Sequence, residues 1–328
     1  MTKEQTGDER SVASERDLAA MYAVYYSNEV GEAENIPPMS LQNVLAVLRH
    51  VFETGMMSVA EQEGRVLGFA GAITRGPVTF LTDLFVHPQI QSSGLGKTLL
   101  QQVLPQRLSL IRCTMSSTDP RAQSLYTRQG MQPLFPHFNL QWRGRVHTEP
   151  LATDLEVVEG EAGDTAFVQW DAQVGGRTRP VDHAFWLEQQ HAIPLWFRRQ
   201  GVTLGYGYVR QVAETLLTPP TWVVGPVGVS APEYATECVL AATRFVGLRQ
   251  VDTHQFELRS SLFDGFKTRH HPESTKYRYS GEQKERAISL GGVPMPPLGS
   301  CATSSSGNRR TEDTVALVWH RAGLALHR

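Results

Sequence analysis

The stretch F-L-T-D-L-F-V-H-P-Q-I-Q-S-S-G-L-G-K-T-L-L-Q-Q-V-L, from Phe80 to Leu104, decides the fold. It begins as an apolar strand that breaks at Pro88, crosses a loop from Gln91 to Gly96, and continues as an amphipathic helix. The first N–H groups of a helix have no partner within the helix, and the helix dipole favours negative charge there. Glycine lets the backbone turn tightly and lets a phosphate come close. The stretch therefore predicts an anion site between a strand and a helix.

The details of the loop distinguish among the families that use such a turn. It has neither the G-x-G-x-x-G of a dinucleotide fold nor the earlier glycine of a P-loop, although Gly-Lys-Thr at 96–98 imitates the end of the latter. The stretch does resemble V-x-P-x-x-[QR]-x-x-G-x-[GA], the acyl-CoA-binding signature of the GNAT acetyltransferase superfamily. The fixed positions of that signature are filled by Val86, Pro88, Gln91, Gly94 and Gly96. An ordinary strand–turn–helix connection is the alternative interpretation.

A second stretch resembles the other signature of the same family, A-x-x-x-Y-x-x-x-G. Ala122, Tyr126 and Gly130 fill its positions. Asp119 is a good N-cap, Pro120 suits the first helical position, and the glycine suits the stop past the last turn. Two signatures in the expected order identify this part of the chain as a member of the GNAT superfamily.

The elements around these signatures follow the order of the first half of the GNAT fold. The expected elements are helices at 18–25 and 41–51 and strands at 57–61, 66–73, 79–86 and 110–115. Ser40 is the expected N-cap of the second helix, and Gly64 lies in the turn between the first two strands. For residues 14–145 the resemblance implies an α+β fold with a mixed sheet, the acyl-CoA N-acyltransferase fold.

The second half of the chain contains a weak internal repeat. Gly64-Arg-Val-Leu-Gly-Phe69 is echoed by Gly201-Val-Thr-Leu-Gly-Tyr206, and Leu84–Pro88 more loosely by Val227–Pro232. We therefore expect the GNAT fold to be duplicated in tandem, with an unrelated α/β domain at 166–266 as the alternative. The expected parts are a GNAT domain at 1–149, a linker at 150–165, and a degenerate GNAT-like domain at 166–328 that includes a loop-rich segment at 267–314 and a last strand near 314–319. No glycine turn follows Pro232, so the second domain is not expected to bind acyl-CoA.

Composition excludes several classes of protein. The 328 residues are 41% hydrophobic and 20% charged with a formal net charge of −2, which is typical of a globular protein without a field that attracts nucleic acid or anionic membrane. No apolar run approaches the ~20 residues of a membrane helix, and the polar start is no signal peptide. The three cysteines lie far apart, which favours a reducing cytoplasm. We expect a cytoplasmic monomer or homodimer without metal.

The resemblance implies acetyl-CoA as the acyl donor. Backbone N–H groups of the glycine loop would hold its pyrophosphate, and the edge of the preceding strand would pair with the amides of its pantetheine arm. A backbone N–H of that edge would also polarise the thioester carbonyl. The cofactor-binding residues we predict are Leu84, Phe85, Val86, Gln91, Ser92, Ser93, Gly94, Leu95, Gly96, Lys97, Thr98 and Asp119.

Two residues are candidates for the chemistry. The acceptor amine is an ammonium at neutral pH and must lose a proton before it attacks. Asp83 is the candidate base, although it could equally be a carboxylate that hydrogen-bonds within the sheet. Tyr126 lies where the family places the acid that protonates the departing thiolate, and its alternative is a half-buried aromatic of the helix.

These observations predict an N-acetyltransferase that moves an acetyl group from acetyl-CoA to a primary amine by direct attack in a ternary complex. A non-catalytic acyl-CoA-binding regulatory protein is the alternative, and a nucleotide-binding protein that uses Gly96-Lys97-Thr98 is a third. The acceptor would be a small-molecule amine that contacts residues 28–42 or the surroundings of Trp186.

Overall fold

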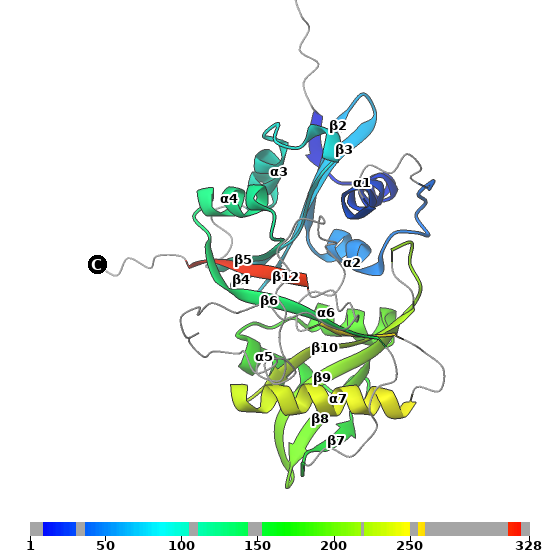
Figure 1. The fold of residues 1–328 in the computed structure, drawn as a ribbon, viewed down its shortest axis with the longest axis vertical. Coiled ribbons are helices and arrows are strands. Elements are labelled where there is room, and N and C mark those ends of the chain that lie inside the picture. Colours follow the sequence, from blue (N-terminus) through cyan, green and yellow to red (C-terminus); the bar gives the residue numbers. More distant parts are fainter. Residues whose placement is uncertain are drawn as a thin grey trace, which may run out of the picture.

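The structure is a computed structural model that describes residues 9–30, 37–104, 111–143, 153–217, 220–249, 255–259 and 314–322. The strands of the first half are β1 (Glu9–Val12), β2 (Met56–Gln62), β3 (Arg65–Arg75), β4 (Val78–Val86), β5 (Ile111–Ser116) and β6 (Gln132–Arg143). Its helices are α1 (Leu18–Val30), α2 (Ala46–Thr54), α3 (Leu95–Val103) and α4 (Pro120–Arg128). Figure 1 shows α1 and α2 on one face of these strands and α3 and α4 on the other. The elements expected from the sequence are therefore present in the expected order.

The second half repeats this order of elements. Its strands are β7 (Glu156–Glu159), β8 (Ile193–Arg199), β9 (Val202–Val212), β10 (Thr221–Val229), β11 (Gln255–Arg259) and β12 (Thr314–Ala322). Its helices are α5 (Ala166–Gly175), α6 (Pro180–Ala184), which continues into a π-helical turn (Phe185–Gln189), and α7 (Ala235–Arg249). β12 confirms the last strand expected near residue 314. The loop-rich segment expected at 267–314 lies almost wholly outside the described residues.

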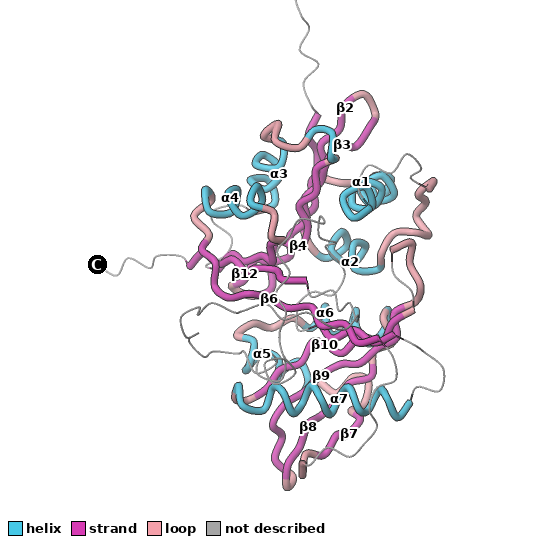
Figure 2. Tube along the Cα trace, in the orientation of Figure 1, coloured by secondary structure: helices cyan, strands magenta, loops and turns pink. Residues whose placement is uncertain are grey.

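The described strands form one mixed sheet in the order β1-β2-β3-β4-β5-β12-β6-β11-β10-β9-β8-β7. β4 pairs with β5 in parallel, as β10 does with β11. The two halves exchange their last strands, because β12 pairs with β5 of the first half and β6 pairs with β11 of the second. Figure 2 shows the strands as a band that continues through the waist of the molecule. Strand pairing therefore crosses the boundary expected from the sequence.

Two matched glycine positions show that the halves are built alike. Glu63 and Gly64 join β2 to β3 at φ values of 52° and 75°, and Gln200 and Gly201 join β8 to β9 at 49° and 78°. An added Cβ at Gly68 would lie 2.8 Å from the carbonyl oxygen of Phe85, and one at Gly205 would lie 2.8 Å from that of Gly228. Both sites therefore need glycine for the same close approach of neighbouring strands.

The structure corrects three local expectations. The strand β1 was not expected. The second helix begins at Ala46, later than expected, because the Ser40 hydroxyl donates to the side-chain oxygen of Asn43 in a turn and caps no helix. The segment 150–165, expected to be a linker, contains the edge strand β7. β1 and β7 each have four residues, and so short a strand contains too few residues for alternation to be recognised in the sequence.

A buried ion cluster joins the two halves. Arg75 of β3 donates to both carboxylate oxygens of Asp182 on α6 at 2.7–3.1 Å. His50 of α2 places Nε2 2.8 Å from the same carboxylate and stacks on Phe185, with ring centroids 4.1 Å apart. Arg75 also donates to the hydroxyl and the carbonyl of Thr54. Because Asp182 is 1% exposed, each charge in this cluster depends on the others for stabilisation.

Breaking this cluster should destabilise the whole molecule. Asp182→Asn leaves the Arg75 guanidinium buried without its counter-charge, so we expect a loss of about 3–5 kcal/mol in the free energy of unfolding at pH 7. Although burial works against it, hydrogen bonding to His50 and Arg75 lowers the pKa of Asp182. The ionised Asp182 carboxylate therefore stabilises the fold above the ordinary carboxyl pKa, and this stabilisation is lost as pH falls below that value.

Urea denaturation at pH 7 measures this loss. Glu15→Gln is the matched control, because Glu15 is 65% exposed and pairs with Arg49 at 3.4 Å. Exposed pairs contribute only about 0–1 kcal/mol. Equal effects of the two changes would contradict the role given to the buried cluster.

Candidate active site

The site begins at an irregularity in β4. Opposite β3 the pairing runs from Gly71 with Asp83 to Ala72 with Leu81, so Thr82 is an extra residue that bulges out of the ladder. On the other side, β4 pairs with β5 only from Val78 through Leu81. Within the described chain, β4 past this point has no partner on β5. The bulge therefore opens a slot between two parallel strands that are paired at their start.

The end of β4 is tied to α1 and to the loop that follows. The Val86 carbonyl accepts from the side-chain amides of Asn28 and Gln91, both at 3.2 Å, and Gln91 also donates to Asn28 at 2.9 Å. The fixed glutamine of the signature thus anchors the loop to the open end of β4. Asn28 was predicted only as the start of the acceptor segment at 28–42, and its contact with β4 was not predicted, because it spans 58 positions of the chain.

The loop itself presents backbone N–H groups to solvent. A 3₁₀ turn (Pro88–Ile90) leads through Ser92, at φ 69°, to Gly94, which is the N-cap of α3 at φ 93°. Ser92, Ser93 and Gly94 are exposed, and an added Cβ at Gly94 would meet nothing within 4 Å. Among the described residues, the amides of Gly94 and Gly96 donate no hydrogen bond. The arrangement fits an anion at a helix N-terminus, as the sequence predicts.

The neighbouring residues of α3 do not complete a nucleotide site. Lys97 is exposed, and its backbone N–H already bonds the Gly94 carbonyl at 3.1 Å. The Thr98 hydroxyl donates to the same carbonyl at 3.4 Å, within its own helical turn. A P-loop needs that hydroxyl for a metal ion. Among the described residues, no group of three or more His, Cys, Asp or Glu is placed to hold one.

Tyr126 reaches the point at which the strands part. It is 5% exposed on α4, and its hydroxyl hydrogen-bonds to Thr114 of β5. Thr114 in turn donates to the Leu81 carbonyl at 3.0 Å, and these two residues are the last pair between β4 and β5. Burial raises the pKa of the Tyr126 hydroxyl above its usual range. The group is therefore protonated at neutral pH and positioned at the base of the slot.

Asp83 lies just past the bulge on the α1 and α2 side of the sheet. It is 1% exposed, its Oδ2 accepts from the Thr82 hydroxyl at 2.6 Å, and its Oδ1 has no partner in the described chain. Burial raises the pKa of Asp83 to about 7, and the Thr82 hydrogen bond lowers it only in part. A carboxyl group with this pKa can take up and release a proton near neutrality.

Asp119 is occupied by local contacts. Its side chain accepts from the Arg121 backbone N–H at 2.8 Å, as the N-cap of α4, and from the Arg121 guanidinium at 2.7–3.1 Å. The predicted cap is confirmed. The other predicted group, around Trp186 in the second half, is buried in an aromatic core with Trp196, Tyr206 and Tyr208.

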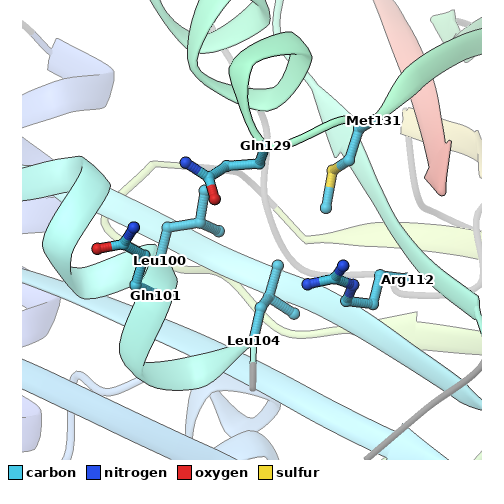
Figure 3. A pocket seen from close by; sticks show the side chains of 6 residues that line it. All are labelled: Leu100, Gln101, Leu104, Arg112, Gln129 and Met131. Carbon is cyan, nitrogen blue, oxygen red and sulfur yellow. The ribbon is translucent and has the colours of Figure 1, made fainter. Parts of the chain in front are cut away.

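A cavity of about 160 Å³ lies elsewhere, at the far ends of α3 and α4 (Figure 3). Its lining residues are Leu100, Gln101, Leu104, Arg112, Gln129 and Met131. None of them is a predicted site residue.

The second half keeps the bulge and lacks the loop. Between Val224 and Val227, β10 has an extra residue opposite β9, so the ladder is interrupted as in β4. A 3₁₀ turn (Pro232–Tyr234) leads directly into α7 without glycine. At the start of α7, Glu237 pairs with Arg199 at 2.8 Å. The first turn of α7 thus carries a carboxylate paired with an arginine, where the first half presents open amides.

A mixed sheet with a bulged, splayed central strand and an amide-lined loop before a helix defines the acyl-CoA N-acyltransferase fold. Residues 18–131 match the family model described as the acetyltransferase (GNAT) family. This part of the chain belongs to the GNAT acetyltransferase family. No curated protein matches the sequence.

Solved structures similar to the whole chain share the fold at low sequence identity. A candidate acetyltransferase from Pyrococcus horikoshii aligns at 12% identity over 98% of this chain and 91% of its own, with a TM-score of 0.61. A GCN5-related N-acetyltransferase from Sphaerobacter thermophilus aligns at 12% identity over 96% and 95%, with a TM-score of 0.56. A tandem GNAT protein from the clavulanic acid biosynthesis pathway aligns at 12% identity over 97% and 99%, with a TM-score of 0.54.

Gly94 provides a test of the loop. Gly94→Ala places a Cβ in open space but at φ 93°, which strains the backbone by about 1–2 kcal/mol. We expect acetyl-CoA affinity, measured by calorimetry, to fall by about tenfold as the strained loop turns its amides away.

The matched control is Gly163→Ala, at φ 97° and also with nothing within 4 Å. It introduces the same strain outside the slot, so stability should fall equally while affinity stays unchanged. An equal loss of affinity in both variants would contradict the role of the loop.

Asp83→Asn should stabilise the fold. Because the folded pKa is raised above the ordinary 3.8, ionisation of Asp83 makes the wild-type chain lose stability as pH rises toward about 7. Asparagine does not ionise, so at pH 8 we expect a gain of up to about 4 kcal/mol in the free energy of unfolding. At pH 4 the gain should vanish.

Asp119→Asn should have the opposite effect on the free energy of unfolding. Urea denaturation at pH 8 should show a loss of stability for this variant and a gain for Asp83→Asn. Although burial raises the pKa of Asp119, Arg121 holds it below the usual range, so its charge stabilises the neutral-pH fold. A loss of stability at pH 8 in Asp83→Asn would show that its carboxylate has a partner the account omits.

Proposed function

We propose that this chain is an acetyl-CoA-dependent N-acetyltransferase with one competent site, in the first half, that acts on a primary amine of a small molecule. The observation that carries the proposal is the slot between β4 and β5, with open amides at its mouth and the Tyr126 hydroxyl at its base. Open amides bind a diphosphate, and an unpaired strand edge binds the amides of an extended pantetheine arm. No other arrangement in the described chain offers both.

The donor supplies an activated acetyl group as a thioester. Amides of Gly94 and Gly96 hold its diphosphate, and the edge of β4 from Leu84 to Val86 orients the arm and polarises the carbonyl. Tyr126, which is protonated at neutral pH, gives a proton to the departing thiolate. Asp83, on the opposite face of the sheet, removes the proton of the acceptor ammonium. The amine then attacks the carbonyl directly.

Direct transfer is favoured over an acyl-enzyme. Cys113 of β5 is the thiol of this region, and burial raises its pKa to about 11. It is therefore a thiol at neutral pH, and thiolate is the nucleophilic form. A reducing compartment such as the cytoplasm suits this buried free cysteine and Cys238. The structure shows no helix, among the described residues, long and apolar enough to cross a membrane.

The second half has a supporting role in this proposal. It contributes β12 to the outer edge of β5, and residues of its loops, such as Leu217, pack on the core beneath α1. The first turn of its own helix α7 carries the negative charge of Glu237 and follows a turn without glycine, so we expect no second donor there. One acetyl-CoA per chain is the expected stoichiometry.

Release of CoA thiol from acetyl-CoA, with mass spectrometry of the products from a panel of primary amines, tests the proposal. We expect Tyr126→Phe to lower kcat by about 100-fold, because the thiolate leaves without a proton donor, with no change in acetyl-CoA affinity. Thr127→Val, on the exposed side of the same helix, is the control. Binding of acetyl-CoA without transfer to any amine would favour the regulatory alternative, and stabilisation by ATP without an effect of CoA would favour a nucleotide site.

A further inference from the structure

Two buried polar atoms of the first half have no partner in the described chain. They are Oδ1 of Asp83 and the hydroxyl of Tyr22 on α1. Asp83 is 1% exposed and Tyr22 is 0% exposed. An unsatisfied buried polar atom costs about 1–3 kcal/mol, so two of them in one region require an explanation.

The contacts of α1 with β4 place these two atoms in the same compartment. Asn28 bonds the Val86 carbonyl, and one helical turn earlier Tyr25 packs edge-on against Phe85, with ring centroids 5.1 Å apart. α1 therefore runs alongside β4 in the same direction. Tyr22 lies one further turn back, about 4.5 Å along the helix, which is the level of Asp83 in the strand.

The register of the sheet shows that Asp83 faces α1. Asp83 pairs with Gly71 and Gly71 with Met57, and paired residues share a face. Met57 and Tyr22 belong to one buried cluster, on the α1 and α2 side. A Cβ at Gly71 would lie 2.9 Å from both the Met57 methyl and Asp83 Oδ2, so glycine makes the room in which the carboxylate turns toward α1.

A base at this depth needs a route by which its proton leaves. Asp83 receives a proton in each turnover, and its side chain has almost no contact with solvent. Tyr26 lies one turn beyond Tyr22 on the same face of α1 and is half-buried. Burial raises the pKa of Tyr22, and the nearby Tyr26 raises it further, so the two side chains are close enough to interact.

We infer that Tyr22 is the proton-exchange partner of Asp83, and that one bound water and the Tyr22 and Tyr26 hydroxyls connect this carboxyl group to solvent. The two unpartnered atoms are not in direct hydrogen-bond contact, and a single water between them gives each a partner. Tyr22 is thus a positioning residue that acts through Asp83. The catalytic meaning of this inference rests on the proposed function.

The relay balances one proton per turnover. An N–H bond of the acceptor ammonium breaks and an O–H bond forms on Asp83. Asp83 then passes its proton to the water, which gives one of its own to Tyr22, which gives its own to Tyr26 and so to solvent. Each member ends as it began, and no oxidant or second substrate is needed.

Several titratable groups lie on the elements packed against this side of the sheet. The hydrophobic cluster there contains Tyr22 and Tyr25 of α1 and the thiol of Cys113 on β5. Glu29 of α1 and His50 of α2 are also buried. The direct neighbour of Asp83 on β4 is the neutral Thr82. Burial raises the pKa of Asp83, and no neighbouring charge contributes to the shift. Removal of a nearby hydroxyl should therefore change the measured pKa of Asp83.

Tyr22→Phe separates a relay from a packing role. It keeps the ring and removes a hydroxyl that has no protein partner in the described chain, so the free energy of unfolding should stay nearly unchanged. We expect kcat to fall by about 10- to 100-fold with the acetyl-CoA KM unchanged, and the solvent isotope effect on kcat to increase. Tyr25→Phe makes the same change one turn away and is the matched control, for which we expect an unchanged kcat. Tyr26→Phe should lower kcat less than Tyr22→Phe does, because water can replace the hydroxyl of the half-buried Tyr26. Wild-type kcat in Tyr22→Phe would overturn the inference.

A second measurement decides the inference without turnover. Infrared titration follows the protonated carboxyl band of Asp83, identified by its loss in Asp83→Asn, with a midpoint of about 7 in the wild-type chain. Because the carboxylate loses a donor through the bridging water, Tyr22→Phe should raise the midpoint by about one pH unit. An unmoved midpoint overturns the inference even if the chain acetylates amines. If Tyr22→Phe shifts the midpoint of Asp83 but the wild-type protein acetylates no amine, the link between Tyr22 and Asp83 is supported and the proposed function is rejected.

Discussion

The single extra residue in β4 is the constraint on which the rest depends. Thr82 lets β4 keep its ladder with β3 while it leaves β5 after Leu81. A regular strand would pair with β5 along its full length and leave no edge for a ligand. The same bulge turns Asp83 toward α1, because one added residue in a strand moves the following side chain to the other face. The slot between β4 and β5 and the orientation of Asp83 therefore have the same cause, the extra residue Thr82.

Duplication explains why the second half has the same bulge without the same chemistry. β10 is interrupted opposite β9 as β4 is opposite β3, but the loop after β10 lacks glycine, and the first turn of α7 contains Glu237 bonded to Arg199. A bulge is a property of strand pairing, whereas an anion site also needs backbone amides without acceptors. The exchange of β6 and β12 pairs the strands of the two halves, and among the described residues it is the loop before α3 of the first half that has amides without acceptors.

The sequence predicts what depends on local chemistry. The loop from Gln91 to Gly96, the cap at Asp119 and the echo between Gly64 and Gly201 each follow from backbone conformations that few residues allow, and each is found as expected. The resemblance to a family adds the role proposed for Tyr126, whereas Asp83 is a candidate base because of its place on the central strand. The partners Thr114 and Asn28 could not be read, because they lie 33 and 58 positions from the atoms they bond. The exchange of strands between the halves could not be predicted either, because neither the sequence of β12 nor that of β5 alone indicates that the two strands pair.

Amide hydrogen exchange with and without acetyl-CoA tests the central claim most directly. If β4 past Leu81 and the loop amides form the donor site, bound acetyl-CoA should slow exchange within residues 83–86 and 92–96, because the amides there that face the slot gain acceptors. The corresponding segments of the second half, 227–229 and 232–237, should exchange at unchanged rates. Protection confined to the second half, or absent from residues 83–86 while acetyl-CoA is bound, would contradict the account.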